Sequence, residues 1–205
     1  MAMNMALKRA RKAQRRKQVV AEKRKVEALE TSLAGRVLRA AQMPIQHCLL
    51  TESLFEIGLG MLVLARGPTP HTVTLSSFLI DVFCLGIKDV MVQSVGAEEF
   101  AIYIETVGAQ APMVPVEPSY ARKLLGDVAA WAQSLGFPPH RDFAVAERMF
   151  GDVSAAGCDV DFRFGRDGKP SYMPGPTESA SLIRRRIDHL RRTLGDDDFD
   201  LEAPL

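Results

Sequence analysis

The sequence predicts an α+β fold: an antiparallel sheet of about five or six strands with helices on one face, plus a protruding basic N-terminal helix. Strand-like apolar stretches occupy the first half of the chain, and amphipathic helical stretches follow residue 118. Strands followed by helices are typical of this class. The basic helix is predicted over residues 6–40, where strong helix formers prevail and no proline occurs before Pro44.

The longest apolar stretch, Val73 to Val92, is expected to form the centre of the sheet. Its alternation predicts a strand that becomes buried on both faces. A membrane span is excluded because Asp81, Lys88 and Asp89 interrupt the stretch. Gly86 breaks the pattern, and the spacing after it fits either a helix or a strand.

Further strands are predicted on both sides of this stretch. Two of them precede it, and the turn-forming sequence Gly-Pro-Thr-Pro indicates an antiparallel meander. A half-buried strand is predicted late in the chain, followed by an Asp-Gly turn and a short return strand. The predicted strands are Ile45 to Thr51, Leu59 to Arg66, Phe100 to Val107, Cys158 to Phe164 and Ser171 to Met173.

Three helices are predicted in the second half from apolar residues at helical spacing. Gly136 is suited to a left-handed cap of the first, and Pro138 and Pro139 prevent its continuation. The helices are expected over 118–135, 142–150 and 179–194. These elements predict a basic N-terminal arm over 1–43, an α+β globular domain over 44–195 and an acidic C-terminal tail over 196–205.

Charge is strongly segregated, although the chain as a whole carries a net charge of only +1. Residues 1–25 carry +9, and the remainder carries −8. A basic segment of this kind is typical of proteins that contact phosphate groups. The expected nucleic-acid-binding residues are Lys8, Arg9, Arg11, Lys12, Arg15, Arg16, Lys17, Lys23, Arg24 and Lys25.

Nucleic-acid binding is therefore the leading functional hypothesis. RNA or a ribonucleoprotein is favoured and DNA is possible, because no recognised DNA-reading motif occurs in the sequence. Such contacts would supply affinity without reading sequence. Four arginines of the last predicted helix, Arg184, Arg185, Arg191 and Arg192, could extend the basic surface.

A hydrolase or nuclease is the first alternative, and whether the protein is an enzyme stays open. Cys84 could act as a nucleophile with His140 as its base, and Asp142 lies near His140 in sequence. A buried Asp81 needs a partner, for which Lys88 or an arginine is suitable. A divalent-metal nuclease would draw on Asp81, Asp89, Asp142, Asp159 or Asp161.

Neither a metal site nor a cofactor is expected. The three cysteines are widely spaced and form no Cys-x-x-Cys pair, which favours a reducing, cytoplasmic location. His47 and Cys48 are adjacent on a predicted strand and should point to opposite faces. The sequence has no phosphate-binding loop, and Gly58 and Gly60 lack the third glycine of a dinucleotide fingerprint.

A protein-interaction module is the second alternative, with the basic helix docked on an acidic partner or on the chain's own acidic tail. Attachment to an anionic membrane is disfavoured because residues 8–18 lack a large apolar face. No apolar stretch follows the N-terminal charges, so a secretory signal is not expected.

Three stretches resemble a family of uncharacterised bacterial proteins that also begin with a Lys/Arg-rich segment. They are FLIDVFCLGIKD, LGFPPHRDFAVAERMFGD and FRFGRDGKPSYMPGP. The resemblance extends over most of residues 44–195 and implies a single domain. It implies no activity, cofactor or catalytic residue.

Overall fold

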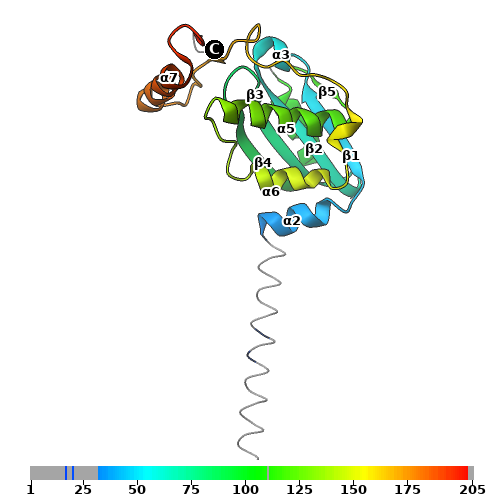
Figure 1. The fold of residues 1–205 in the computed structure, drawn as a ribbon. Helices are drawn as coiled ribbons and strands as arrows, with labels where there is room; N and C mark the ends of the chain where they lie inside the picture. Colours follow the sequence, from blue (N-terminus) through cyan, green and yellow to red (C-terminus); the bar gives the residue numbers. More distant parts are fainter. Residues whose placement is uncertain (1–16, 18–19, 21–31, 110, 203–205) are drawn as a thin grey trace, which may run out of the picture.

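The computed structural model describes residues 17, 20, 32–109 and 111–202 of the chain. These residues fold around a five-stranded sheet with the order β4-β3-β2-β1-β5 (Figure 1), and every neighbouring pair is antiparallel. The predicted α+β class and antiparallel sheet are confirmed. The strands are β1 (Ile45–Thr51), β2 (Leu59–Thr69), β3 (Thr72–Asp81), β4 (Gly86–Gly96) and β5 (Met113–Pro115).

The central apolar stretch forms the β3–β4 hairpin, so the segment after Gly86 is a strand rather than a helix. Successive residues of β3 enter two different cores. Phe78 and Ile80 belong to the core on one face, and Val73 and Leu75 to the core on the other. All four are at most 2% exposed, as the pattern of a strand buried on both faces predicted.

Helices α2, α5 and α6 cover the first face of the sheet, where the larger core lies (Figure 1). Leu124, Leu125 and Val128 of α5 are essentially inaccessible to solvent, in agreement with the helical spacing of the sequence. Gly136 follows α5 with a φ of +85°, which is the predicted left-handed conformation. The bounds are Leu33–Ala40 for α2, Pro118–Ser134 for α5 and Phe143–Ala146 for α6, which continues into the 3-10 helix η1 (Glu147–Phe150).

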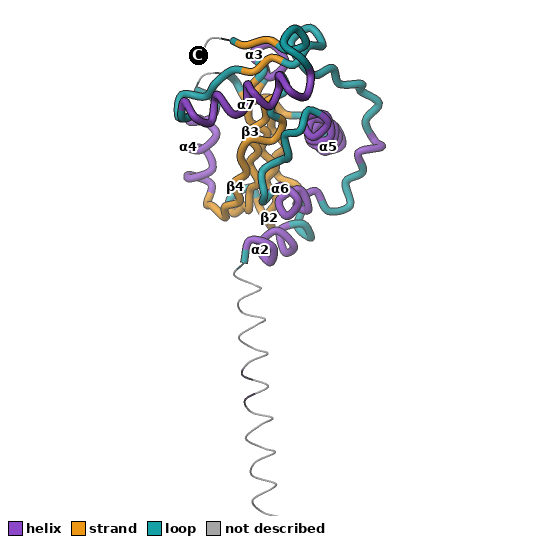
Figure 2. The backbone as a smooth tube through the Cα atoms, turned by 60° about the vertical axis from the view of Figure 1, so that its left-hand side comes forward, coloured by secondary structure: helices purple, strands orange, loops and turns teal. Residues whose placement is uncertain are grey.

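Helix α4 (Ala97–Val107) lies on the opposite face of the sheet (Figure 2), and the strand predicted over 100–107 is wrong. The Glu99 carboxylate accepts a hydrogen bond from the Gly96 N–H at 3.2 Å, which stabilises the first turn of the helix. Phe100, Tyr103 and Ile104 face the second core at helical spacing. Their burial against the sheet outweighs the strand propensity of the segment.

The strand predicted over 158–164 is also wrong, because no other strand pairs with this segment. The alternation of apolar and polar residues in this segment nevertheless reflects burial of its aromatic side chains. Phe162 and Phe164 turn towards α5 and pack beside Tyr120 and Trp131, with ring centroids 5.0 and 5.3 Å apart. The segment therefore covers helix α5 rather than extending the sheet.

The C-terminal part of the described chain forms a smaller cluster around Tyr172 and Phe199. The predicted Asp-Gly turn is present, with φ values of 54° at Asp167 and 86° at Gly168. The return strand exists but pairs in parallel with residues from the C-terminal tail, not with the segment before the turn. These elements are β6 (Ser171–Tyr172), helix α7 (Ala180–Leu194) and β7 (Asp200–Leu201).

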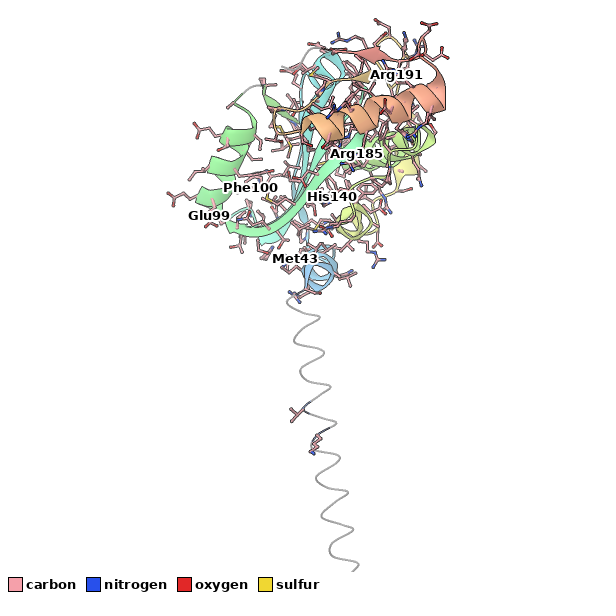
Figure 3. The ribbon with its side chains drawn as sticks, turned by 90° about the vertical axis from the view of Figure 1, so that its left-hand side faces the viewer. Met43, Glu99, Phe100, His140, Arg185 and Arg191 are labelled. Carbon is pink, nitrogen blue, oxygen red and sulfur yellow. The ribbon has the colours of Figure 1, made fainter. Side chains whose placement is uncertain are left out.

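Helices α2 and α7 lie at opposite ends of the folded body (Figure 3). Lys17 is described as an exposed helical residue. The other nine predicted nucleic-acid-binding residues lie outside the described part of the chain.

Candidate functional site

Asp81 ends strand β3 and organises the turn between β3 and β4. Its Oδ1 atom accepts hydrogen bonds from the Phe83 N–H at 3.0 Å and from the Cys84 N–H at 2.8 Å. The residue is only 5% exposed. Burial raises the pKa of the Asp81 carboxyl above its usual value, and the nearby Lys88 charge and backbone N–H groups oppose this shift. The expectation of Lys88 as a charged neighbour of a buried Asp81 fits this environment.

Lys88 occupies a β-bulge in strand β4. The pairing with β3 shifts from Ile80–Ile87 to Leu79–Asp89, which leaves Lys88 as the extra residue. Bulges change the direction in which a side chain points and are frequent beside functional sites. Here the bulge accompanies a lysine that borders two separate cavities.

Glu178, in the segment before α7, links three polar side chains. Its carboxylate accepts a hydrogen bond from the Tyr172 hydroxyl and lies 2.5 Å from the Nη1 atom of Arg186. The Lys88 Nζ atom is 3.7 Å from Glu178 Oε1, which is an ion pair beyond hydrogen-bond distance. Burial disfavours the ionised Glu178, but the hydrogen bonds from Tyr172 and Arg186 outweigh it and hold its pKa below the usual value.

The first cavity opens beside Asp81 and Lys88 at the end of the sheet where the short helix α3 (Leu54–Ile57) lies. Its volume is about 50 Å³. Ser171 adds a third polar side chain. The remaining walls are mostly apolar and comprise Ile57, Leu59, Phe83, Met173, Pro174 and Pro176, with Gly58 and Gly175 between them.

Gly58 shapes one wall of this cavity. It has a φ of +85°, and a Cβ atom there would lie 2.1 Å from the Phe83 ring. Its carbonyl accepts a hydrogen bond from the Val82 N–H at 2.8 Å. Only glycine allows both the left-handed backbone and this close approach of the aromatic ring.

The second cavity lies between β4, α7 and the loop after α5, and it is more polar. Its volume is about 190 Å³. Lys88, His140 and Arg186 line it together with Leu85, Ile87, Phe137 and Pro138. Lys88 is the polar residue that the two cavities share.

The structure brings the predicted catalytic residues together in two pairs, His140 with Asp142 and Cys84 with Asp81. His140 lies 3.9 Å from Asp142 and 3.8 Å from Asp89. Cys84 contacts the Asp81 carboxylate through its backbone, while its side chain lies in the cluster around Tyr172. Burial raises the pKa of the Cys84 thiol, and the Asp81 charge raises it further, so the thiolate that a nucleophile needs is disfavoured.

The other candidate ligands are dispersed. His47 stacks on Phe100 with ring centroids 4.6 Å apart, whereas Cys48 enters the opposite core, as strand geometry predicted. Burial raises the pKa of Cys48 to about 12, with a further contribution from Glu117. Within the described ranges, no three His, Cys, Asp or Glu side chains gather as a metal site.

The α7 arginines Arg184, Arg185, Arg191 and Arg192 are exposed. Arg191 pairs with Asp196 at 3.0 Å and with Asp188 at 3.9 Å. Figure 3 shows α7, with Arg185 and Arg191 labelled, at the far end of the body from α2.

No protein-family model matches this chain, and no curated protein or solved structure is significantly similar to it. Across residues 32–109 and 111–202, no helix has the length and apolar character needed to cross a membrane.

Sequence reasoning did not find Tyr172, Glu178 and Arg186 as parts of a polar cluster. Tyr172 and Glu178 stand on either side of a Pro-Gly-Pro sequence, and Arg186 is one of several arginines in α7. The available signal was spacing, because Arg186 stands three residues after Ile183 and four before Leu190, on the apolar face of the predicted helix.

Proposed function

We propose that the protein binds nucleic acid, preferentially RNA or a ribonucleoprotein, through phosphate contacts of its basic N-terminal segment. The observation that carries this proposal is the segregation of charge. The first 25 residues carry +9, while the rest of the chain carries −8. An anionic polymer is the partner that best complements a cationic segment attached to an acidic body.

The proposed contacts are electrostatic and independent of base sequence. Lysine and arginine side chains neutralise phosphates and release condensed counterions, so affinity should fall steeply as salt rises. RNA is favoured over DNA because the sequence contains no recognised element that reads base edges in the major groove. DNA binding of comparable strength would place the protein among general phosphate-backbone binders.

Fluorescence anisotropy on the full chain tests the proposal. Labelled single-stranded RNA, duplex RNA and duplex DNA of equal length would be titrated at low and at physiological salt. The test variant replaces all ten Lys/Arg of residues 8–25 by Gln. We expect its affinity for RNA to fall by at least about tenfold, with a much smaller dependence of affinity on salt.

The matched control replaces the four exposed α7 arginines, Arg184, Arg185, Arg191 and Arg192, by Gln. This control removes basic residues from the other end of the body and should retain most of the affinity. Equal losses in the two variants would contradict a site in the N-terminal segment. Absence of salt-dependent binding by the unaltered chain would overturn the proposal altogether.

A further inference from the structure

We infer that the cavity beside Asp81 and Lys88 is a binding site for a small, largely apolar molecule that carries one carboxylate group, with the carboxylate placed at the Lys88 ammonium. This site belongs to the folded body and is independent of the proposed nucleic-acid binding. The inference depends on three features: the lining of the cavity, the charge balance around Lys88, and the rigid backbone that holds both.

The lining matches a ligand with an apolar body and a single polar end. Six apolar side chains form most of the wall, and the polar side chains are Asp81, Lys88 and Ser171. Ser171 is 1% exposed, and its hydroxyl donates to Glu202, so it has little capacity for a ligand. Sites for small molecules commonly combine apolar walls with a few fixed polar groups.

The charge balance around Lys88 leaves room for one negative charge. Among the described residues, Glu178 is the acid within 4 Å of the Lys88 ammonium, at 3.7 Å. That carboxylate also lies 2.5 Å from Arg186, so two cations share one anion. The neighbouring Asp81 uses its Oδ1 atom to accept hydrogen bonds from the Phe83 and Cys84 N–H groups. One additional carboxylate would neutralise the group formed by Lys88, Arg186 and Glu178.

A singly charged headgroup fits better than a phosphate monoester. The monoester carries close to two negative charges at neutral pH. Glu178 would repel the second charge. An ammonium headgroup is disfavoured by Lys88 and Arg186. The geometry therefore selects a monocarboxylate among simple ligand classes.

The backbone around the cavity is well fixed. The Asp81 side chain holds the turn after β3 through two backbone hydrogen bonds. The N–H of Ser171 donates to the Phe83 carbonyl at 2.8 Å, which joins the wall containing Met173 to the wall containing Phe83. A site held by rigid elements loses little conformational entropy on binding.

Hexanoate, 1-hexanol and hexylamine form a matched set of probes, since they share a tail and differ in the charge of the headgroup. Each would be titrated to about 10 mM, a range that detects millimolar dissociation constants, into the ¹⁵N-labelled full chain. We expect hexanoate to shift the amide signals of Gly58, Phe83, Lys88 and Gly175, which line the cavity. Hexanol and hexylamine should bind at least about tenfold more weakly.

The variant Lys88→Met keeps the length of the side chain and removes its charge. Glu178 retains Arg186 and Tyr172 as partners, so we expect the variant to fold. Its hexanoate dissociation constant should rise at least about tenfold. Lys169→Met is the control, because Lys169 pairs with Asp200 and does not line the cavity.

Three results would overturn the inference. They are hexanol binding as tightly as hexanoate, shifts confined to residues away from the cavity, and no saturable shift with hexanoate over the whole titration. The comparison of headgroups uses the unaltered chain, so it decides the question even if Lys88→Met does not fold.

Discussion

The guanidinium group of Arg66 donates a hydrogen bond to the carbonyl oxygen of Phe150 at 2.7 Å. The same group donates to the carbonyls of Ala41 at 3.0 Å and of Met43 at 2.6 Å. Ala41 and Met43 closely follow α2, and Phe150 is the last residue of η1. Backbone oxygens at the end of a helix lack partners within the helix. A single strand residue, 8% exposed, therefore fixes the ends of two helical segments against the sheet.

Replacement of Arg66 by Met should destabilise the fold strongly. The change leaves three carbonyl groups without their charged donor, and hydrogen bonds to charged groups each contribute about 1.5–3 kcal/mol. Partial access of water to the carbonyls offsets part of this loss, so we expect a decrease of about 3 kcal/mol in the free energy of unfolding. Urea denaturation measures it. Arg163→Met is the control, since Arg163 is exposed, and a similar loss there would contradict the assigned role of Arg66.

Asp81→Asn should increase stability at neutral pH. Burial raises the pKa of Asp81 in the folded state above its ordinary value of 3.8. The folded protein therefore binds this proton more tightly than the unfolded chain, and stability falls as the pH rises from 3.8 through the folded-state pKa. Asn avoids this loss while its side-chain oxygen can still accept the hydrogen bonds from Phe83 and Cys84.

Denaturation curves between pH 3.5 and pH 8 would measure this difference. The stability of Asp81→Asn relative to the unaltered protein should be greatest at the upper end and should shrink towards the acidic end. The exposed Asp159 provides the control variant Asp159→Asn, which should not show this pattern. If Asp81→Asn were less stable than the unaltered protein at neutral pH, and if this deficit became smaller in acid, the raised pKa of Asp81 would be contradicted.

The helical conformation of residues 97–107 leads to opposite expectations for two apolar residues. Phe100 is 8% exposed, whereas Ile102 is 57% exposed. Phe100→Ala should therefore cost about 3 kcal/mol of stability, and Ile102→Ala should change it by less than about 0.5 kcal/mol. Thermal and urea denaturation would measure both. A strand would place the two side chains on the same face, and equal losses would support that strand.

These residues also show why part of the fold escaped prediction. Phe100, Ile102 and Ile104 alternate as in a strand, but Phe100, Tyr103 and Ile104 fit a helical face equally well. The choice depends on the second core, which receives Val63 and Val73 from distant strands. In contrast, Gly136 and the Asp-Gly turn were predicted correctly because local backbone preferences decide them.

Only part of the candidate site could be predicted from the sequence. Asp81 and Lys88 belong to one hairpin, so a buried acid with a nearby lysine could be expected from the sequence. Glu178 and Arg186 reach the same place from a later segment, and no local pattern relates them to the hairpin. Cys84 and His140 suggested a catalytic pair by residue type alone, but burial and the direction of each side chain depend on tertiary packing.

Phe199 should protect Cys84 from thiol reagents. The ring is 7% exposed and belongs to the same cluster as Cys84, Leu85, Tyr172 and Leu190. Phe199→Ala removes a large side chain from this cluster and should destabilise the packing of the C-terminal segment by about 3 kcal/mol. Local opening would then expose Cys84, and its labelling by an aromatic disulfide reagent should accelerate on the order of a hundredfold.

Mass spectrometry of digested, labelled protein would assign the rate to Cys84 rather than to Cys48 or Cys158. Leu201→Ala is the matched control, because Leu201 lies in β7 close to Phe199 but is 50% exposed. It should leave the labelling rate of Cys84 nearly unchanged. Equal acceleration in both variants would indicate that β7 pairing, rather than the Phe199 ring, protects the thiol. Rapid labelling of Cys84 in the unaltered protein would contradict its burial, because a fully packed thiol reacts only after the surrounding structure opens.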